Sequence, residues 1–170
     1  DIARRGHESR VAAAEIGAEL LMHDLPDTAI EVGQATITPI IDAIAATAAT
    51  LIYTHTDKDV HQDHRSVHRS TLVAAREVPR VFAYQAPSTS ADFLPTRFED
   101  ITDYLDAKIR LIECYATQEG RPYLEHELLR STARYWARFA RGTRYVEPFE
   151  VVRDAHHHAT SPAAAARANA

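Results

Sequence analysis

The chain has 170 residues, of which 45% are hydrophobic and 25% charged, and this composition is typical of one globular domain with a full core. Its formal net charge of -5 argues against a nucleic-acid partner, because phosphate binding needs a concentrated basic surface. The single cysteine excludes an intramolecular disulfide, no apolar run reaches the ~18 residues of a transmembrane segment, and no signal peptide is visible, so we expect a cytoplasmic protein.

The first part of the chain predicts a helix, a strand and a second helix. Residues 2–16 are expected to form a helix that ends at Gly17, and residues 18–25 a strand that stops before Pro26. A second helix is indicated by four isoleucines at the spacing i, i+3, i+4, i+7, with Thr38 and Pro39 as its N-cap and first residue. The isoleucines are Ile37, Ile40, Ile41 and Ile44.

The rest of the chain continues this alternation. The expected strands are residues 51–54, 80–84 and 145–152, and the expected helices are residues 63–77, 101–112 and 124–140. Residues 86–97 form a long polar loop, and loops of that length are often functional. We divide the chain into a domain of residues 1–152 and a disordered tail of residues 153–170, which is rich in Ala and His.

Strands that alternate with helices of ten to fifteen residues predict the α/β class. The expected architecture is Rossmann-like, with three layers, α/β/α, around a mostly parallel sheet. Such sheets place their binding sites where strands end in polar residues and lead into helices.

A dense cluster of histidine and aspartate directly follows the strand expected at residues 51–54. Four of the ten histidines and three aspartates fall within residues 55–68. They are His55, His61, His64, His68, Asp57, Asp59 and Asp63. Imidazole and carboxylate groups bind zinc-like cations and transfer protons near neutral pH, so we expect the chemistry of the protein here.

If the third helix begins near Asp63, His64 and His68 lie one turn apart on it and His61 lies just before its first turn. His64 is then placed to bind a metal, and His61 to act as an acid whose ring Asp63 or Asp59 orients. Two other interpretations stay open: a surface loop that has gathered these residues by chance, and a self-contained metal site formed by His61, His64, His68 and Asp59.

The segment Asp59-Val-His-Gln-Asp-His64 resembles the D-x-H-x-D-H signature of the PIG-L/LmbE-like de-N-acetylase superfamily. Four other segments resemble family elements in the same order. They are Arg5-Gly-His-Glu8 with Ile16-Gly17, then Pro26-Asp27, then Asp100-Ile-Thr102 with Lys108 and Ala116-Thr-Gln118, and finally Tyr145-Val-Glu-Pro-Phe149. The resemblance covers about residues 1–152.

The resemblance implies a zinc-dependent hydrolase that removes the acetyl group from a small-molecule amino-sugar conjugate of the N-acetylglucosamine type. It implies that His64 is a metal ligand, His61 a general acid or oxyanion stabiliser, and Asp63 the partner that orients His61. Asp59 is expected to support the site from behind, and Arg5 to contact the sugar or a phosphate. The alternative for Arg5 is a surface ion pair with Glu8, and the metal is zinc or iron.

The family's first signature, A-H-P-D-D-E, does not occur in this sequence. In the family it supplies two metal ligands and a general base, so we expect an N-terminally truncated piece that lacks the first strand and helix, has an incomplete zinc site and is inactive alone. Such a piece is expected to expose a strand edge at residues 51–54 or 20–23 and to form homo-oligomers. The alternative function is a metal-free, non-catalytic binding or interaction domain.

Overall fold

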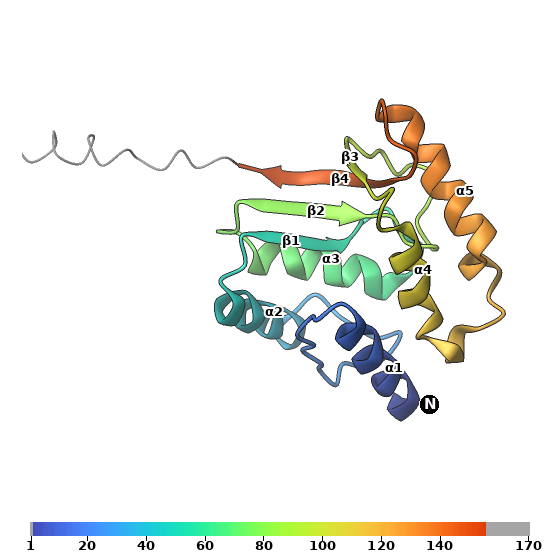
Figure 1. The fold of residues 1–170 in the computed structure, drawn as a ribbon. Helices are drawn as coiled ribbons and strands as arrows, with labels where there is room; N and C mark the ends of the chain where they lie inside the picture. Colours follow the sequence, from blue (N-terminus) through green and yellow to red (C-terminus); the bar gives the residue numbers. More distant parts are fainter. Residues whose placement is uncertain (1, 156–170) are drawn as a thin grey trace, which may run out of the picture.

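The computed structural model describes residues 2–155, which form helices around one four-stranded sheet (Figure 1). The helices are α1 (Ile2–Glu15), α2 (Gln34–Thr47), α3 (Gln62–Ala74), α4 (Leu105–Glu113) and α5 (His126–Trp136), with short 3-10 turns η1 (Ala116–Gln118), η2 (Pro122–Leu124) and η3 (Ala137–Phe139). The strands are β1 (Leu51–His55), β2 (Arg80–Tyr84), β3 (Arg97–Asp100) and β4 (Val146–Asp154), in the spatial order β1-β2-β4-β3.

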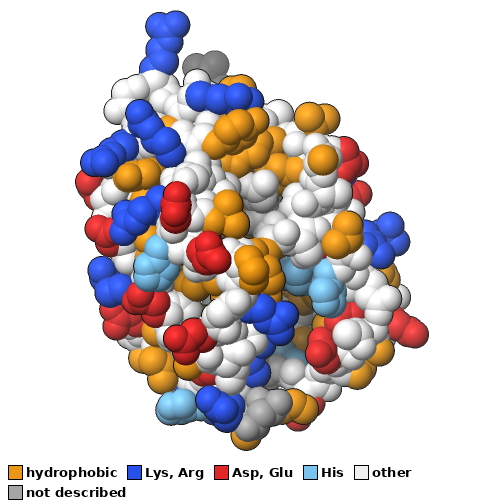
Figure 2. Space-filling view, turned by 90° about the vertical axis from the view of Figure 1, so that its right-hand side faces the viewer, with side chains coloured by type: hydrophobic (Ala, Val, Ile, Leu, Met, Phe, Trp, Pro, Cys, Tyr) orange, Lys and Arg blue, Asp and Glu red, His pale blue; other side chains and the backbone are white. Residues whose placement is uncertain are grey.

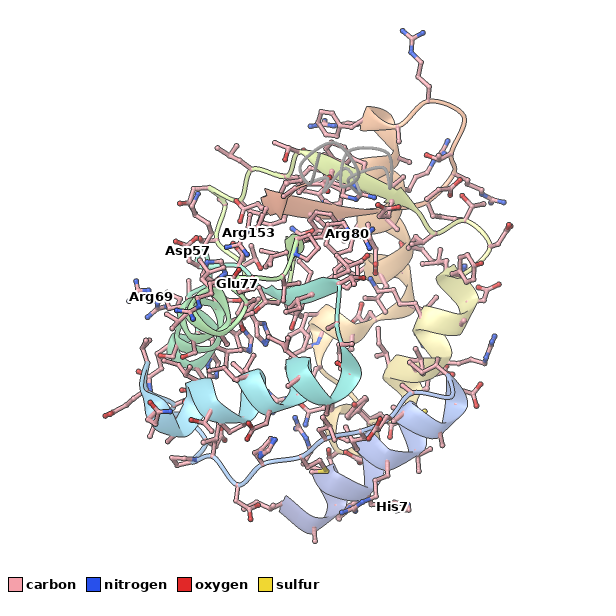
Figure 3. The ribbon with its side chains drawn as sticks, turned by 90° about the vertical axis from the view of Figure 1, so that its left-hand side faces the viewer. His7, Asp57, Arg69, Glu77, Arg80 and Arg153 are labelled. Atoms are coloured by element: carbon pink, nitrogen blue, oxygen red, sulfur yellow. The ribbon has the colours of Figure 1, made fainter. Side chains whose placement is uncertain are left out.

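The sheet lies between two groups of helices, so the mixed α/β fold expected from the sequence is confirmed. In Figure 3, which looks along the strands, α3 lies on one side of the sheet and α4 and α5 lie on the other. On the α3 side, Val81 of β2 packs with Ala75 and Val78 in a buried cluster. On the other side, Leu105 and Ile109 of α4 form a second cluster with Ala133 of α5. The helices α4 and α5 lie toward the end at which β1 and β2 finish (Figure 1).

The expectation of a mostly parallel sheet is wrong. β1 and β2 are parallel, but β4 pairs antiparallel with both β2 and β3. The chain leaves β2, passes through β3, α4 and α5, and returns in β4 from the end at which β2 finished. No rule of alternation predicts this return, because β3 has only four residues and the sequence Arg-Phe-Glu-Asp, which carries no apolar pattern.

Residues 18–25, which the sequence predicted as a strand, form no strand in the structure. A strand is stable only when its N–H and C=O groups pair with a neighbouring strand, and within residues 2–155 β1 has β2 as its only strand neighbour. The segment instead runs as irregular backbone. Its residues Leu21 and Leu25, together with Ile40 of α2 and Ile52 of β1, line an apolar cavity of about 460 Å³.

Several predicted boundaries shift. α2 begins at Gln34, so Thr38 and Pro39 lie inside the helix and are not its N-cap and first residue. α4 begins at Leu105, four residues later than expected, and α5 gives way to η3 after Trp136. By contrast, α1 ends as predicted, with Gly17 at a left-handed φ of 65°.

β4 continues to Asp154, two residues beyond the expected domain end at residue 152. Arg153 explains this extension, because its guanidinium donates hydrogen bonds to the carbonyls of Ala75 and Val78 after α3, at 2.6 and 2.8 Å (Figure 3). Most of the expected tail, residues 156–170, lies outside the described residues. Among residues 2–155, no helix is long and apolar enough to span a membrane.

Candidate functional site

The site is built on the loop that joins the end of β1 to the start of α3. Thr56, the first residue after β1, is fully buried and donates a hydrogen bond to Glu150 of β4 at 2.5 Å. The Thr56 hydroxyl also accepts the N–H of Lys58 at 3.1 Å, and the Lys58 ammonium lies 3.8 Å from the Glu150 carboxylate. Buried polar groups that are paired in this way fix the path of the loop, so the residues that follow are held in defined positions.

Asp59 and His64 form the centre of the site. The buried Asp59 carboxylate contacts His64 Nδ1 at 2.9 Å and accepts the N–H of His61 at 2.8 Å. Burial acts to raise the pKa of Asp59, but the hydrogen bonds from His64, His61 and Ser88 outweigh it, and the pKa is lowered. Asp59 is therefore an anion, and its contact with Nδ1 leaves His64 Nε2 as the nitrogen with a free lone pair.

His55, at the end of β1, lies against His64. The two rings are stacked, with centroids 3.9 Å apart and planes 9° apart, and His55 Nε2 lies 3.1 Å from the Tyr84 hydroxyl. Burial, reinforced by the nearby His64, lowers the pKa of His55 to about 4, so the ring is neutral at pH 7. Its Nδ1 is buried without a hydrogen-bond partner among the described residues, which is unusual for a polar atom in a folded protein.

His61 is the N-cap of α3. Its Nδ1 accepts the backbone N–H of Asp63 at 3.2 Å, and its ring lies 4.6 Å from that of His64. Since Nδ1 accepts a hydrogen bond, the proton of the neutral ring is on Nε2, which makes His61 a donor toward the site. The sequence predicted that a carboxylate would orient this ring, whereas in the structure the backbone N–H of Asp63 does so.

The Asp63 carboxylate has a different set of partners. It is buried and accepts the backbone N–H groups of Thr28 and Ile30 at 2.7 and 3.1 Å. Thr28 has a left-handed φ of 63°, a conformation that costs energy in a β-branched residue. Asp63 thus holds the turn after Pro26 against the start of α3, and it supports His61 indirectly.

His68 and Arg5 lie apart from the Asp59–His64 pair. The buried His68 ring contacts the carbonyl of His55 through Nδ1 at 2.7 Å, which fastens α3 to the end of β1. Arg5 is exposed on α1. The carboxylate of Glu8 accepts two hydrogen bonds from Thr117 of η1, at 2.6 and 2.8 Å. These hydrogen bonds, with smaller contributions from the charges of Arg4 and Arg5, lower the pKa of Glu8.

Three of these side chains bring groups that bind metals close together. Ligand atoms of His55, Asp59 and His64 all lie within 4.8 Å of one another, and imidazole nitrogen and carboxylate oxygen suit zinc. Because an Asp59 oxygen already contacts His64 Nδ1, a metal on His64 would be bound by Nε2. The orphaned Nδ1 of His55 is the observation that favours a ligand here, since coordination satisfies a buried nitrogen that otherwise has no partner. Sequence reasoning included His55 in the cluster but did not select it.

The sequence missed two more contributors. Ser88, from the long loop after β2, places its hydroxyl 3.2 Å from His64 Nδ1, and Tyr84 reaches His55. Thr89 of the same loop pairs with Asp59 in an isolated antiparallel bridge. The length of this loop led us to expect a functional role, but no spacing in the sequence indicated which of its serines would reach the histidines.

Comparison with known proteins links the chain to deacetylases. Residues 1–75 match the family PIG-L, described as GlcNAc-PI de-N-acetylase, and this segment contains Asp59, His61, Asp63 and His64. The resemblance to the PIG-L/LmbE-like superfamily is therefore confirmed. The uncharacterized deacetylase YaiS of Escherichia coli K12 is 36% identical over 63 residues, a match that covers 36% of this chain and about a third (34%) of YaiS.

Two solved structures share the fold. The 4-carboxy-2-hydroxymuconate hydratase GalB from Pseudomonas putida KT2440 superposes with a TM-score of 0.77 at 21% identity, over 94% of this chain and 75% of GalB. The N,N'-diacetylchitobiose deacetylase from Pyrococcus horikoshii gives a TM-score of 0.72 at 16% identity, over 88% of this chain and 63% of that protein. At these identities the likeness concerns the fold alone. The two proteins share this fold although one is named a hydratase and the other a deacetylase.

Proposed function

Because residues 1–75 match the PIG-L de-N-acetylase family, we propose that the protein is a metal-dependent hydrolase that removes an acetyl group from an N-acetylglucosamine-type amino sugar. The observation that supports this most directly is the pairing of His64 with Asp59 at 2.9 Å. A carboxylate on one nitrogen of a histidine fixes the tautomer and increases the basicity of the other nitrogen, which is the usual arrangement behind a metal-binding histidine.

In the proposed site, His64 holds the metal through Nε2 and Asp59 supports it from behind. His55 lies next to this position with an unpartnered Nδ1 and is the residue best placed to add a second nitrogen. When bound, a zinc ion polarises a carbonyl and lowers the pKa of its water to about 7. The identity of the metal as zinc rests on the nitrogen and oxygen donors.

His61 is proposed to donate the proton that the leaving nitrogen requires. Hydrolysis of the acetamide breaks the C–N bond, joins a water oxygen to the carbonyl carbon and requires a proton on the leaving nitrogen, so that acetate and a free amine are released. With Nδ1 held by the Asp63 N–H, His61 presents Nε2–H as the donor for the leaving nitrogen or for the developing oxyanion. Asp63 keeps the start of α3 in place, and Arg5 remains a proposed contact for the sugar or a phosphate.

The decisive experiment measures acetate release from N-acetylglucosamine conjugates by the protein as its gene encodes it, with zinc supplied. We expect activity that His64→Ala reduces by a factor of at least about 10². His126→Ala is the matched control, because His126 lies on the surface, where it pairs with Glu113, and its loss is expected to leave the rate unchanged. Acetate release that survives His64→Ala would exclude this proposal.

One observation favours the alternative of a metal-free binding domain. The rings of His55 and His64 are stacked in nearly parallel planes, so their in-plane lone pairs do not converge on one point, and both can coordinate one ion only after one ring turns. Zinc titration followed by calorimetry separates the two functions. A binding-domain function is supported by the absence of zinc binding at millimolar concentration together with the absence of acetate release, and saturable binding that needs His64 excludes it.

A further inference from the structure

A large cavity opens between the sheet and α5, on the side of the sheet opposite α3. Its volume is about 980 Å³, in the range of sites that bind drug-sized ligands. The wall is mainly aromatic and aliphatic, and includes Tyr84, Phe149, Leu128 and Trp136. Figure 2 looks at the molecule from the side of α4 and α5 and shows hydrophobic side chains gathered around a hollow, with histidine side chains beside it.

The cavity and the histidine cluster share a wall. Tyr84 lines the cavity, and its hydroxyl lies 3.1 Å from His55 Nε2. Pro87 and Thr89 also line the cavity, and they flank Ser88, whose hydroxyl lies 3.2 Å from His64 Nδ1. A molecule that presents its acetamide to the cluster can therefore place an attached group in the cavity.

The charges in the cavity wall are already paired. The two cations are Arg97, which pairs with Glu99 and lies 3.6 Å from Asp154, and Lys108, which pairs with Glu147. The Arg97 guanidinium also stacks over the Phe82 ring, 4.6 Å from its centroid. A phosphate group would have to compete with these carboxylates, whereas an uncharged group that covers apolar wall meets no such competition.

We propose that this cavity binds an uncharged aromatic group carried by the amino-sugar substrate and discriminates against a phosphate at the same position. The inference rests on the proposed function for the sugar end of the substrate, and it adds the chemical class of the group attached to that sugar. Stacking and burial against Tyr84, Trp136 and Phe149 provide the affinity.

Trp136 is the one tryptophan in the sequence, so its fluorescence reports on the cavity without any requirement for catalysis. We would titrate the protein with phenyl N-acetyl-β-glucosaminide, N-acetylglucosamine and N-acetylglucosamine 1-phosphate. The phenyl glycoside is expected to change the emission and to bind at least about tenfold more tightly than the other two. Equal affinity for all three, or tighter binding of the phosphate, overturns the inference.

Two matched variants locate the binding. Leu128→Asp introduces a charge into the wall and is expected to weaken binding of the phenyl glycoside by at least about tenfold, whereas Leu20→Asp, at an exposed leucine outside the cavity, is expected to leave it unchanged. A normal circular dichroism spectrum for both variants shows that they are folded. If Leu128→Asp is folded and binds like the wild type, the aromatic group is not in this cavity.

The same reagents separate failure of this inference from failure of the proposed function. Preferred binding of the phenyl glycoside without acetate release would support the cavity assignment and count against the enzyme. Acetate release with no preference among the three sugars would support the enzyme and remove the cavity assignment.

Discussion

At the scale of single residues, the site depends on which nitrogen of each histidine is occupied. Asp59 engages Nδ1 of His64, and the Asp63 N–H engages Nδ1 of His61. Both rings therefore present Nε2 to the site, one as a lone pair and the other as an N–H. In the function that we propose, this difference makes His64 the metal ligand and His61 the proton donor.

Asp59→Asn is expected to weaken zinc binding by a factor of about 10–100, because an amide fixes the His64 tautomer less well and carries no charge. Asp57→Asn is the matched control, since Asp57 is exposed two residues away and has no part in the Asp59–His64 contact (Figure 3). Calorimetric titration with zinc measures both. Equal affinities for the two variants would show that Asp59 does not support a metal ligand.

His61 has two roles that substitution can separate. His61→Ala removes both the N-cap of α3 and the proposed proton donor, so we expect a loss of about 1 kcal/mol in the free energy of unfolding and a rate lower by about 10²–10⁴. His61→Asn keeps a side-chain oxygen that can cap the helix, so stability is expected to recover while activity does not. Urea unfolding and acetate release test this, and recovery of activity in His61→Asn would contradict a proton-transfer role.

His55 is expected to make stability depend on pH. The unfolded chain binds a proton at this residue below a pH of about 6.5, but the folded protein does so only near its lowered pKa of about 4. The free energy of unfolding therefore falls as the pH drops from 6.5 to 4, by about 3 kcal/mol at most because the ring is partly exposed.

Urea unfolding of the metal-free protein at pH 7 and pH 4.5 measures this effect. His55→Gln is expected to lose less stability between the two pH values than the wild type does. His7→Gln, at an exposed histidine on α1 (Figure 3), is expected to behave like the wild type. Identical pH dependence in all three proteins would show that His55 is not held neutral by its surroundings.

At the scale of elements, the buried hydroxyl of Thr56 ties the loop between β1 and α3 to β4, beside the ion pair of Lys58 with Glu150. Thr56→Val keeps the shape of the side chain but leaves the Glu150 carboxylate and the Lys58 N–H without this partner. We expect a loss of about 1–3 kcal/mol in the free energy of unfolding. Thr50→Val, at an exposed threonine, is expected to change it by less than about 0.5 kcal/mol. Equal losses would mean that the buried contact does not hold the loop.

The elements that the sequence predicted well are those with a strong local signal. The isoleucines of α2 at helical spacing and the apolar run of β1 need no distant partner to be recognised. The strand expected at residues 18–25 failed because its formation depends on a neighbouring strand, which local sequence does not report. The antiparallel return of β4 was missed for the same reason.

In the candidate site too, the sequence predicted what depends on neighbouring residues and missed what depends on distant ones. The motif predicted that His61 lies just before α3 and His64 in its first turn, because this spacing at the start of a helix is local. It did not identify the partner of each carboxylate. Asp63 binds the turn at Thr28, 35 residues away, and Ser88 reaches His64 from 24 residues away. Both contacts depend on how α3 packs against distant loops, and no sequence spacing contains that information.

At the scale of the whole molecule, β1 is an edge of the sheet among the described residues, and exposed apolar side chains lie on it and on the segment beside it. Leu21 and Met22 of the neighbouring irregular segment, residues 18–25, are 47% and 50% exposed. Tyr53 of β1 is 49% exposed, and its ring lies on the cavity face of the sheet, 5.1 Å from the Phe149 ring. An unpaired strand edge flanked by apolar surface is a template for association with another chain. Of the two edges that the sequence suggested, the structure therefore leaves residues 51–54 as the candidate, since residues 20–23 form no strand.

We expect the chain of 170 residues to self-associate at micromolar to millimolar concentration through this edge. Tyr53→Lys is expected to reduce the association, because a charge on an edge strand opposes pairing with a second strand. Val73→Lys is the control, since Val73 is 53% exposed on α3 and is not part of β1. Sedimentation velocity over a concentration series measures the effect. A wild-type chain that stays monomeric throughout, or equal association of the two variants, would show that the β1 edge is protected by its own surroundings.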